Sequence, residues 1–156
     1  RIERRRGGDL RDPLPQVGPL LDRPLGSYGL EALGMLGEAQ WVAGDVVHAR
    51  RSYEEALSLN RRRNDLPEIA TCLEALAEVA VCEERPQTAV RLLAAAASLR
   101  ETIGVPLTIG DRARLDDRLE RLRGLLGAAE FASSWSAGRS LSTEAAIDEA
   151  VTTPRA

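Results

Sequence analysis

From Leu30 onward, apolar residues recur every three or four positions, which is the spacing of one face of a helix. Gly, Asn, Asp and Pro residues interrupt this pattern at 44–45, 64–67 and 104–106. Gly and Asn suit the end of a helix, whereas Pro suits its first turn. The pattern therefore predicts four helices, over about residues 30–44, 45–63, 68–83 and 86–103.

These four predicted helices form two copies of one unit, related by an offset of forty residues. At this offset Leu33, Leu36, Gly37, Ala49, Tyr53 and Ala56 correspond to Leu73, Leu76, Ala77, Ala89, Leu93 and Ala96. The pattern resembles the tetratricopeptide repeat, in which small residues let neighbouring helices approach while a large residue fills the gap between them. The offset exceeds the usual period of ~34 residues. We expect two such repeats over residues 30–107.

Three further helices are predicted over residues 108–151. The fifth has an apolar face and ends at Gly127, because leucines step by four, three and four at Leu115, Leu119, Leu122 and Leu126. Phe131 and Trp135 lie one turn apart on a sixth helix. Ser142 can cap a short last helix that reaches about Val151, and residues 152–156 are expected to fray.

The composition supports an all-α fold. Ala, Leu, Glu and Arg dominate, aromatic residues make up 3%, and runs of β-branched residues are missing. We therefore predict a tetratricopeptide-like α-solenoid of antiparallel helix pairs with a C-terminal helical cap. A solenoid must cover the apolar face of its last repeat, and Phe131 and Trp135 are the expected cap residues.

Residues 1–29 lack this periodicity and are rich in Arg, Gly and Pro, which predicts a linker or disordered leader. The Arg4–Arg6 cluster suggests an alternative function, that of a helical fragment that binds nucleic acid through this leader. The net charge of -3 argues against general attraction to nucleic acid or anionic lipid. No apolar run approaches the ~20 residues of a membrane span, so we expect a cytoplasmic protein. The first residue is not Met, which suggests a piece of a longer protein.

Two segments near the C-terminus resemble a known class of protein tail. The stretch RPQTAVRLLAAAASLRETIGVPL, followed by FASSWSAGRSLSTEAAIDEAV, is similar to the end of large bacterial regulators in which an ATPase module precedes tetratricopeptide repeats. Some of these are LuxR-type or antibiotic-regulatory-type transcription activators, and others carry a cyclase-like or kinase domain. The resemblance covers about residues 30–151 and implies a regulatory tail. Ala94 stands where the family often has Gly.

The sequence offers no catalytic, cofactor or metal site. All 21 basic residues are Arg, which excludes a Walker A lysine or a Schiff base. His48 is the only histidine and is expected to face solvent. Cys72 and Cys82 are about 15 Å apart along one predicted helix, too far for a disulfide, and are expected to be buried or half-buried. A small helical enzyme would need a perturbed pair of acids, and no such pair is evident.

We predict a partner-binding groove on the first helix of each repeat. In tetratricopeptide folds this helix lines the groove at positions that here hold Glu31, Gly34, Glu38, Trp41, Glu74 and Glu78. Such an acidic lining would repel a peptide carboxylate, so the expected ligand is a basic peptide or an arginine-bearing neighbouring domain. A solvated acidic face is the competing interpretation. Trp41 could contact the ligand or pack in the core.

Together these observations predict a non-catalytic protein-interaction and regulatory module. Its partner would be a protein, a peptide or an upstream domain of the same protein, with direct nucleic-acid binding expected to be absent at physiological salt.

Overall fold

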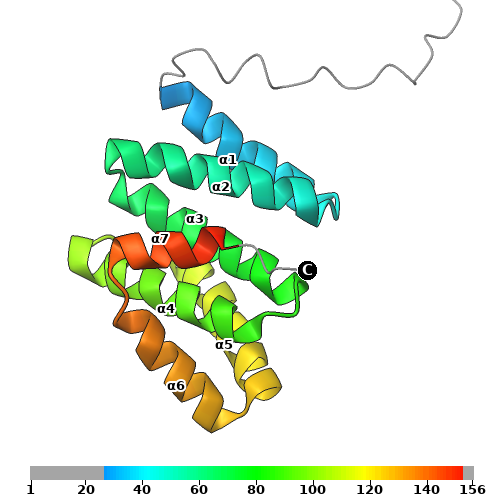
Figure 1. Ribbon diagram of the computed structural model, residues 1–156, viewed down its shortest axis with the longest axis vertical. Coiled ribbons are helices and arrows are strands. Elements are labelled where there is room, and N and C mark those ends of the chain that lie inside the picture. Colours follow the sequence, from blue (N-terminus) through cyan, green and yellow to red (C-terminus); the bar gives the residue numbers. More distant parts are fainter. Residues whose placement is uncertain (1–26, 153–156) are drawn as a thin grey trace, which may run out of the picture.

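The computed structural model describes residues 27–152, and within this range the chain is helical, with no strand (Figure 1). The elements in order are α1 (Ser27–Val42), α2 (Val46–Arg63), α3 (Leu66–Cys82), α4 (Pro86–Ile103), α5 (Ile109–Leu126), α6 (Ala128–Arg139) and α7 (Thr143–Val151). The all-α prediction is therefore confirmed. The first helix begins at Ser27, three residues before the predicted start at Leu30. Residues 1–26, including the Arg4–Arg6 cluster, lie outside the described range.

Short polar residues start most of these helices. The side chains of Asp45 and Asp65 accept hydrogen bonds from backbone N–H groups at the starts of α2 and α3, and Thr108 does the same for α5. Ser142 accepts from the N–H of Ala145 at 3.1 Å, which confirms its predicted role as the N-cap of α7. A helix N-terminus leaves several N–H groups without partners, so each cap replaces lost hydrogen bonding to water.

The backbone repeats itself at the offset of forty residues. Gly44 and Glu84, which precede α2 and α4, both have positive φ angles, of 80° and 58°. Each donates to the carbonyl of the residue three positions earlier, at 3.0 and 3.1 Å. Asn64 and Gly104, which follow the same two helices, also share a left-handed conformation. The two units predicted from side-chain pattern thus end and turn in the same way.

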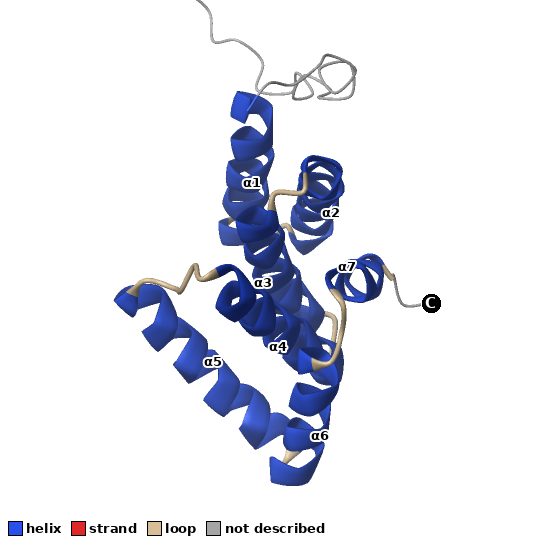
Figure 2. Cartoon of the chain, turned by 90° about the vertical axis from the view of Figure 1, so that its left-hand side faces the viewer, coloured by secondary structure: helices blue, strands red, loops and turns tan. Residues whose placement is uncertain are grey.

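Consecutive helices from α1 to α4 pack on one another, and α4 also contacts α5, α6 and α7 (Figures 1 and 2). Much of the surface of α4 is buried, with small residues at Ala89, Ala94, Ala95 and Ala96. Because alanine keeps side chains short, several helices can approach α4 at once. The helix α5 is packed less fully, since only Leu115 and Leu122 are buried along its length.

Two glycines mark close helix crossings. A Cβ atom at Gly138 in α6 would lie 2.3 Å from the carbonyl oxygen of Arg91 in α4. A Cβ atom at Gly37 in α1 would lie 2.6 Å from the ring of Tyr53 in α2. The pairing of Gly37 with a large Tyr53 side chain agrees with the expectation of a small residue beside a large one.

No helix in the described range is long and apolar enough to cross a membrane.

Candidate interaction surfaces

An exposed stripe of alternating acidic and apolar residues runs along α1. Glu31, Met35, Glu38 and Val42 follow one another at steps of four, three and four, so they lie on one side of the helix. All four are exposed, and the exposed fractions of Met35 and Val42 are 70% and 80%. Neither carboxylate forms an ion pair with another residue in the range 27–152. We call these four residues the α1 stripe.

The other two predicted groove residues on α1 flank this stripe. Gly34 and Trp41 are both half-buried, and Trp41 packs against the hydrophobic core. The indole of Trp41 thus has one part in the core and one part at the surface beside the stripe. Packing in the core and contact with a ligand, the two roles considered for Trp41, are therefore compatible.

The predicted groove residues of α3 are engaged within the molecule. Glu74 accepts two hydrogen bonds from the guanidinium of Arg100 in α4, at 2.7 and 3.0 Å. Glu78 forms an ion pair with Arg118 in α5. A pocket of about 210 Å³ beside these pairs is lined mainly by Arg, Leu and acidic side chains of α3, α4 and α5. In the part of the predicted groove on α3, arginines of later helices therefore pair with both carboxylates.

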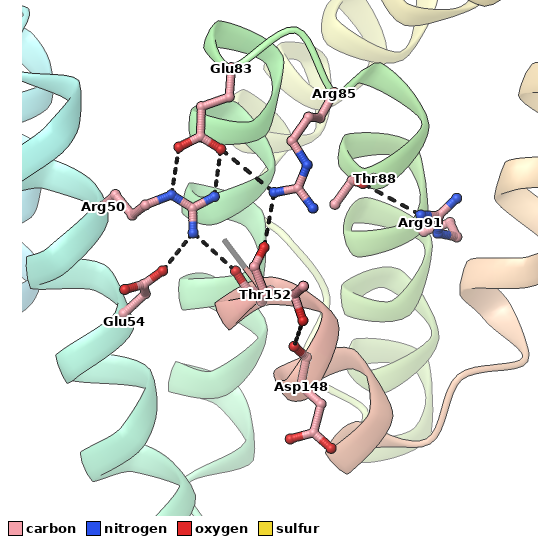
Figure 3. A network of polar contacts seen from close by, with 9 residues as sticks. Arg50, Glu54, Glu83, Arg85, Thr88, Arg91, Asp148 and Thr152 are labelled. Atoms are coloured by element: carbon pink, nitrogen blue, oxygen red, sulfur yellow. Dashed lines mark hydrogen bonds and ion pairs between the residues drawn. The ribbon is translucent and has the colours of Figure 1, made fainter. Parts of the chain in front are cut away.

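A second polar cluster centres on Arg50, which is buried in α2 although arginine is usually exposed (Figure 3). Its Nε and one terminal nitrogen donate to the two carboxylate oxygens of Glu83, each at 2.6 Å. Its other terminal nitrogen donates to Glu54 at 2.5 Å and to the backbone carbonyl of Ala150 in α7 at 3.3 Å. The hydrogen bonds that Arg50 donates to the Glu83 carboxylate raise the pKa of Arg50 further above its ordinary value. Arg50 therefore joins α2, the end of α3 and α7.

Three more arginines hold α7. Arg85 donates to the carbonyl of Thr152 at 3.2 Å (Figure 3). Arg91 in α4 pairs with Glu149, and Arg61 in α2 pairs with Glu144. The apolar side of α7 is buried at Ala146, Ile147 and Ala150. We call the surface of α2, α3 and α4 that contacts α7, with its arginines Arg50, Arg61, Arg85 and Arg91, the α7 seat.

The predicted cap residues lie together on α6. The rings of Phe131 and Trp135 are stacked, with centroids 6.1 Å apart and an interplanar angle of 11°. The guanidinium of Arg123 in α5 lies 4.8 Å from the centre of the Phe131 ring, within the range of a cation–π contact. Phe131 is buried, whereas Trp135 is half-buried. Arg139 ties the end of α6 to Glu101 of α4 through hydrogen bonds of 3.0 and 2.7 Å.

The remaining reactive side chains are the one histidine and the two cysteines of the chain. His48 is exposed, as predicted, and its ring contacts Asp45 at 2.7 Å at the start of α2. Burial raises the pKa of the Cys72 thiol to about 11, so this thiol is protonated at neutral pH. Cys82, which was expected to be buried or half-buried, is exposed because it lies in the last turn of α3. Within residues 27–152 no group of three or more His, Cys, Asp or Glu residues could hold a metal ion.

Sequence reasoning missed the α7 seat. Arg50, Arg61, Arg85 and Arg91 are separated by six to twenty-four positions, and nothing in their neighbourhood distinguishes them from solvated arginines. The nearest local signal is the acidic face of α7 itself, with Glu144, Asp148 and Glu149.

Comparison with known proteins gives no relative: no family model matches the sequence, and no curated protein or solved structure is significantly similar to the chain.

Proposed function

We propose that this chain is a non-catalytic protein-interaction module of the tetratricopeptide kind, which binds a basic amphipathic helix or peptide along the α1 stripe. The observation that carries the proposal is the stripe itself, in which acidic and apolar side chains alternate on one exposed helix face. A partner helix with arginines and leucines at matching spacing would pair its charges with Glu31 and Glu38 and cover Met35 and Val42.

The repeat architecture is supported by the recurrence of turn geometry. Helix ends that share φ sign and hydrogen bonding at an offset of forty residues are expected when one supersecondary unit is used twice. In tetratricopeptide proteins the first helix of each unit faces the ligand, and here that helix carries the α1 stripe. The resemblance of the C-terminal segments to ATPase-linked bacterial regulators favours a role as a regulatory tail in the cytoplasm.

An ion pair between α3 and α5 is an internal example of the proposed recognition, in which a glutamate of one helix pairs with an arginine of another. Position 38 of α1 corresponds to position 78 of α3 at the offset of forty. Glu78 pairs with Arg118 of α5, while Leu115 and Leu122 of α5 are buried. An arginine of the amphipathic helix α5, which packs on α4 and α6, thus already pairs with the α3 counterpart of Glu38. We infer that α1 accepts a helix of the same character from a partner.

Peptide titration tests this proposal. In a Trp135→Phe background Trp41 is the only tryptophan, so its fluorescence reports binding beside the stripe. We expect an arginine- and leucine-rich helical peptide to bind, a glutamate-rich peptide of equal length not to bind, and the affinity to fall as salt rises.

Reversing the charges of the α1 stripe tests whether the basic peptide binds there. Glu31→Arg/Glu38→Arg should weaken binding of the basic peptide by about tenfold or more, which corresponds to ~1.4 kcal/mol. Asp116→Arg/Glu120→Arg changes the net charge equally on an exposed part of α5 and should have a small effect. Tighter binding of the acidic peptide, or equal effects of the two double variants, would refute the proposal. Absence of binding by either peptide would leave the stripe as a solvated face.

A further inference from the structure

The helix α7 is bound as an acidic ligand would be. Its carboxylates at Glu144 and Glu149 pair with Arg61 and Arg91 on two different helices. Its carboxyl end, at the carbonyls of Ala150 and Thr152, accepts hydrogen bonds from Arg50 and Arg85 (Figure 3). The C-terminal end of a helix carries partial negative charge, so cations there recognise both the end of a helix and its direction. The α7 seat therefore fixes the register of an acidic helix.

The fit of α7 in its seat is incomplete. A pocket of about 170 Å³ remains between the start of α7 and helices α3 and α4, and Ala146 is one of the residues that line it. Its walls on α3 and α4 include Leu73 and Leu99. A larger apolar side chain at the position of Ala146 would fill this space and add buried apolar surface. The α7 helix has nine residues, shorter than the ~12–15 needed for a helix to be stable alone.

We propose that the α7 seat is a binding site for an acidic amphipathic helix of a partner protein, which displaces α7. This helix would carry carboxylates at the positions of Glu144 and Glu149 and a Leu or Met at the position of Ala146. Its free C-terminal carbonyls would take the hydrogen bonds of Arg50 and Arg85. The site lies on different elements from the α1 stripe and takes a ligand of opposite charge, so it is independent of the proposed function.

The partner helix and α7 compete for the same seat. Because α7 is tethered to α6 by residues 140–142, it has a high effective concentration at the seat. A free helix must therefore bind better than α7 to displace it, and filling the pocket beside Ala146 supplies that advantage. Once displaced, α7 and residues 140–142 would be exposed to solvent.

The experiment uses the whole chain and a synthetic peptide. The peptide repeats residues 141–152 with Leu in place of Ala146, and carries a fluorophore at its N-terminus. Binding is followed by anisotropy, and hydrogen exchange of the chain is measured with and without unlabelled peptide. We expect saturable binding, at least tenfold tighter than that of the peptide with Ala146 retained. We also expect faster exchange of backbone amides at 145–151 when the peptide is bound.

A charge swap separates specific docking from general attraction. In the variant Arg91→Glu, the peptide with Glu149 should lose about tenfold in affinity, and a peptide carrying Glu149→Arg should recover it. A matched control is Arg112→Glu, which removes an exposed arginine in the first turn of α5, away from the seat. Arg91→Glu also removes the ion pair of Arg91 with the chain's own Glu149, so the recovery of affinity by the swapped peptide, rather than the loss, is the decisive result.

Three results would overturn the proposal. One is absence of peptide binding at concentrations up to ~1 mM, the limit of weak recognition. Another is binding that leaves exchange at 145–151 unchanged, because the peptide would then occupy a different surface. The third is a concentration-dependent dimer of the chain alone whose exchange at 145–151 is unchanged by peptide, which would assign the seat to α7 of a second copy.

Discussion

At the scale of single residues, Gly138 shows how one missing carbon atom decides a helix crossing. A Cβ atom there would lie 2.7 Å from the Cα of Arg91 and 2.8 Å from the Cβ of Ala94. With the carbonyl oxygen of Arg91 at 2.3 Å, two of the three nearest atoms belong to the backbone of α4, so α4 and α6 would have to separate. We expect Gly138→Ala to lower the free energy of unfolding by ~1–3 kcal/mol, as overpacking does. Urea unfolding followed by circular dichroism measures this change.

Gly124 is the matched control for this substitution. It also lies in a helix, and an added Cβ atom would meet nothing within 4 Å. Gly124→Ala should therefore raise stability by ~0.5–1 kcal/mol, because alanine loses less backbone entropy on folding. If Gly138→Ala were also stabilising, the close approach of α4 and α6 at this point would be wrong.

Local features of residues could be predicted from the sequence, whereas their distant partners could not. The cap at Ser142 and the stop at Gly127 depend on neighbours within a few positions, so the sequence predicts them. Arg50 could not be distinguished from a solvated arginine, because two of its partners, Glu83 and Ala150, lie 33 and 100 positions away. Glu74 and Glu78 were predicted as groove residues, and their pairing with Arg100 and Arg118 was not predicted, because these arginines belong to later helices.

At the scale of elements, α6 bears the predicted cap, but its two aromatic residues differ in burial. Phe131 is buried between Arg123 and Trp135, whereas Trp135 keeps part of its ring in solvent. We expect Phe131→Ala to cost ~3–5 kcal/mol and Trp135→Ala to cost less than ~3 kcal/mol, because the cost depends on the surface removed from water. Thermal melts of the two variants rank these costs.

The control for this pair is Phe131→Leu, which keeps an apolar side chain and should retain most of the stability. A Trp135→Ala variant that melts lower than Phe131→Ala would show that the indole, rather than the phenyl ring, anchors α6.

The boundaries of the helices could be predicted from periodicity, because the apolar face of a helix is formed by residues three or four positions apart within one continuous segment. The breaks after α2 and α4 lie where they were expected, and both carry left-handed residues, Asn64 and Gly104. The packing of α5 and α7 was less predictable. Each has one narrow apolar face, and several surfaces of the preceding helices could cover it equally well.

At the scale of the whole molecule, three exposed carboxylates make the stability of the fold depend on pH in the same direction. Hydrogen bonding by Arg139 lowers the pKa of Glu101 from its ordinary value of 4.5. Contact with His48 lowers the pKa of Asp45, and hydrogen bonding by Thr108, followed by Arg114, lowers that of Asp111. A pKa that is lower in the folded state means stability that is present above the unfolded-state value and lost as pH falls.

We therefore expect the melting temperature to be constant from about pH 8 to about pH 5 and to fall below about pH 4.5. Differential scanning calorimetry across this range measures the effect. Glu101→Gln should reduce the fall, because it removes one of the three groups, whereas Glu120→Gln should not. A melting temperature that rises on acidification would contradict the assigned directions.

The central position of α4 has a consequence for the order in which the chain assembles during synthesis. A ribosome releases α1 to α4 first, and these helices contact their immediate neighbours, so they can dock while α5 is still being made. The later helices then meet a partner surface that is already formed. The hydrogen bond from Arg50 to Ala150 spans 100 positions, and it closes when α7 has emerged. Within residues 27–152, α7 is thus the helix whose docking ties α2 and the end of α3 to the finished fold.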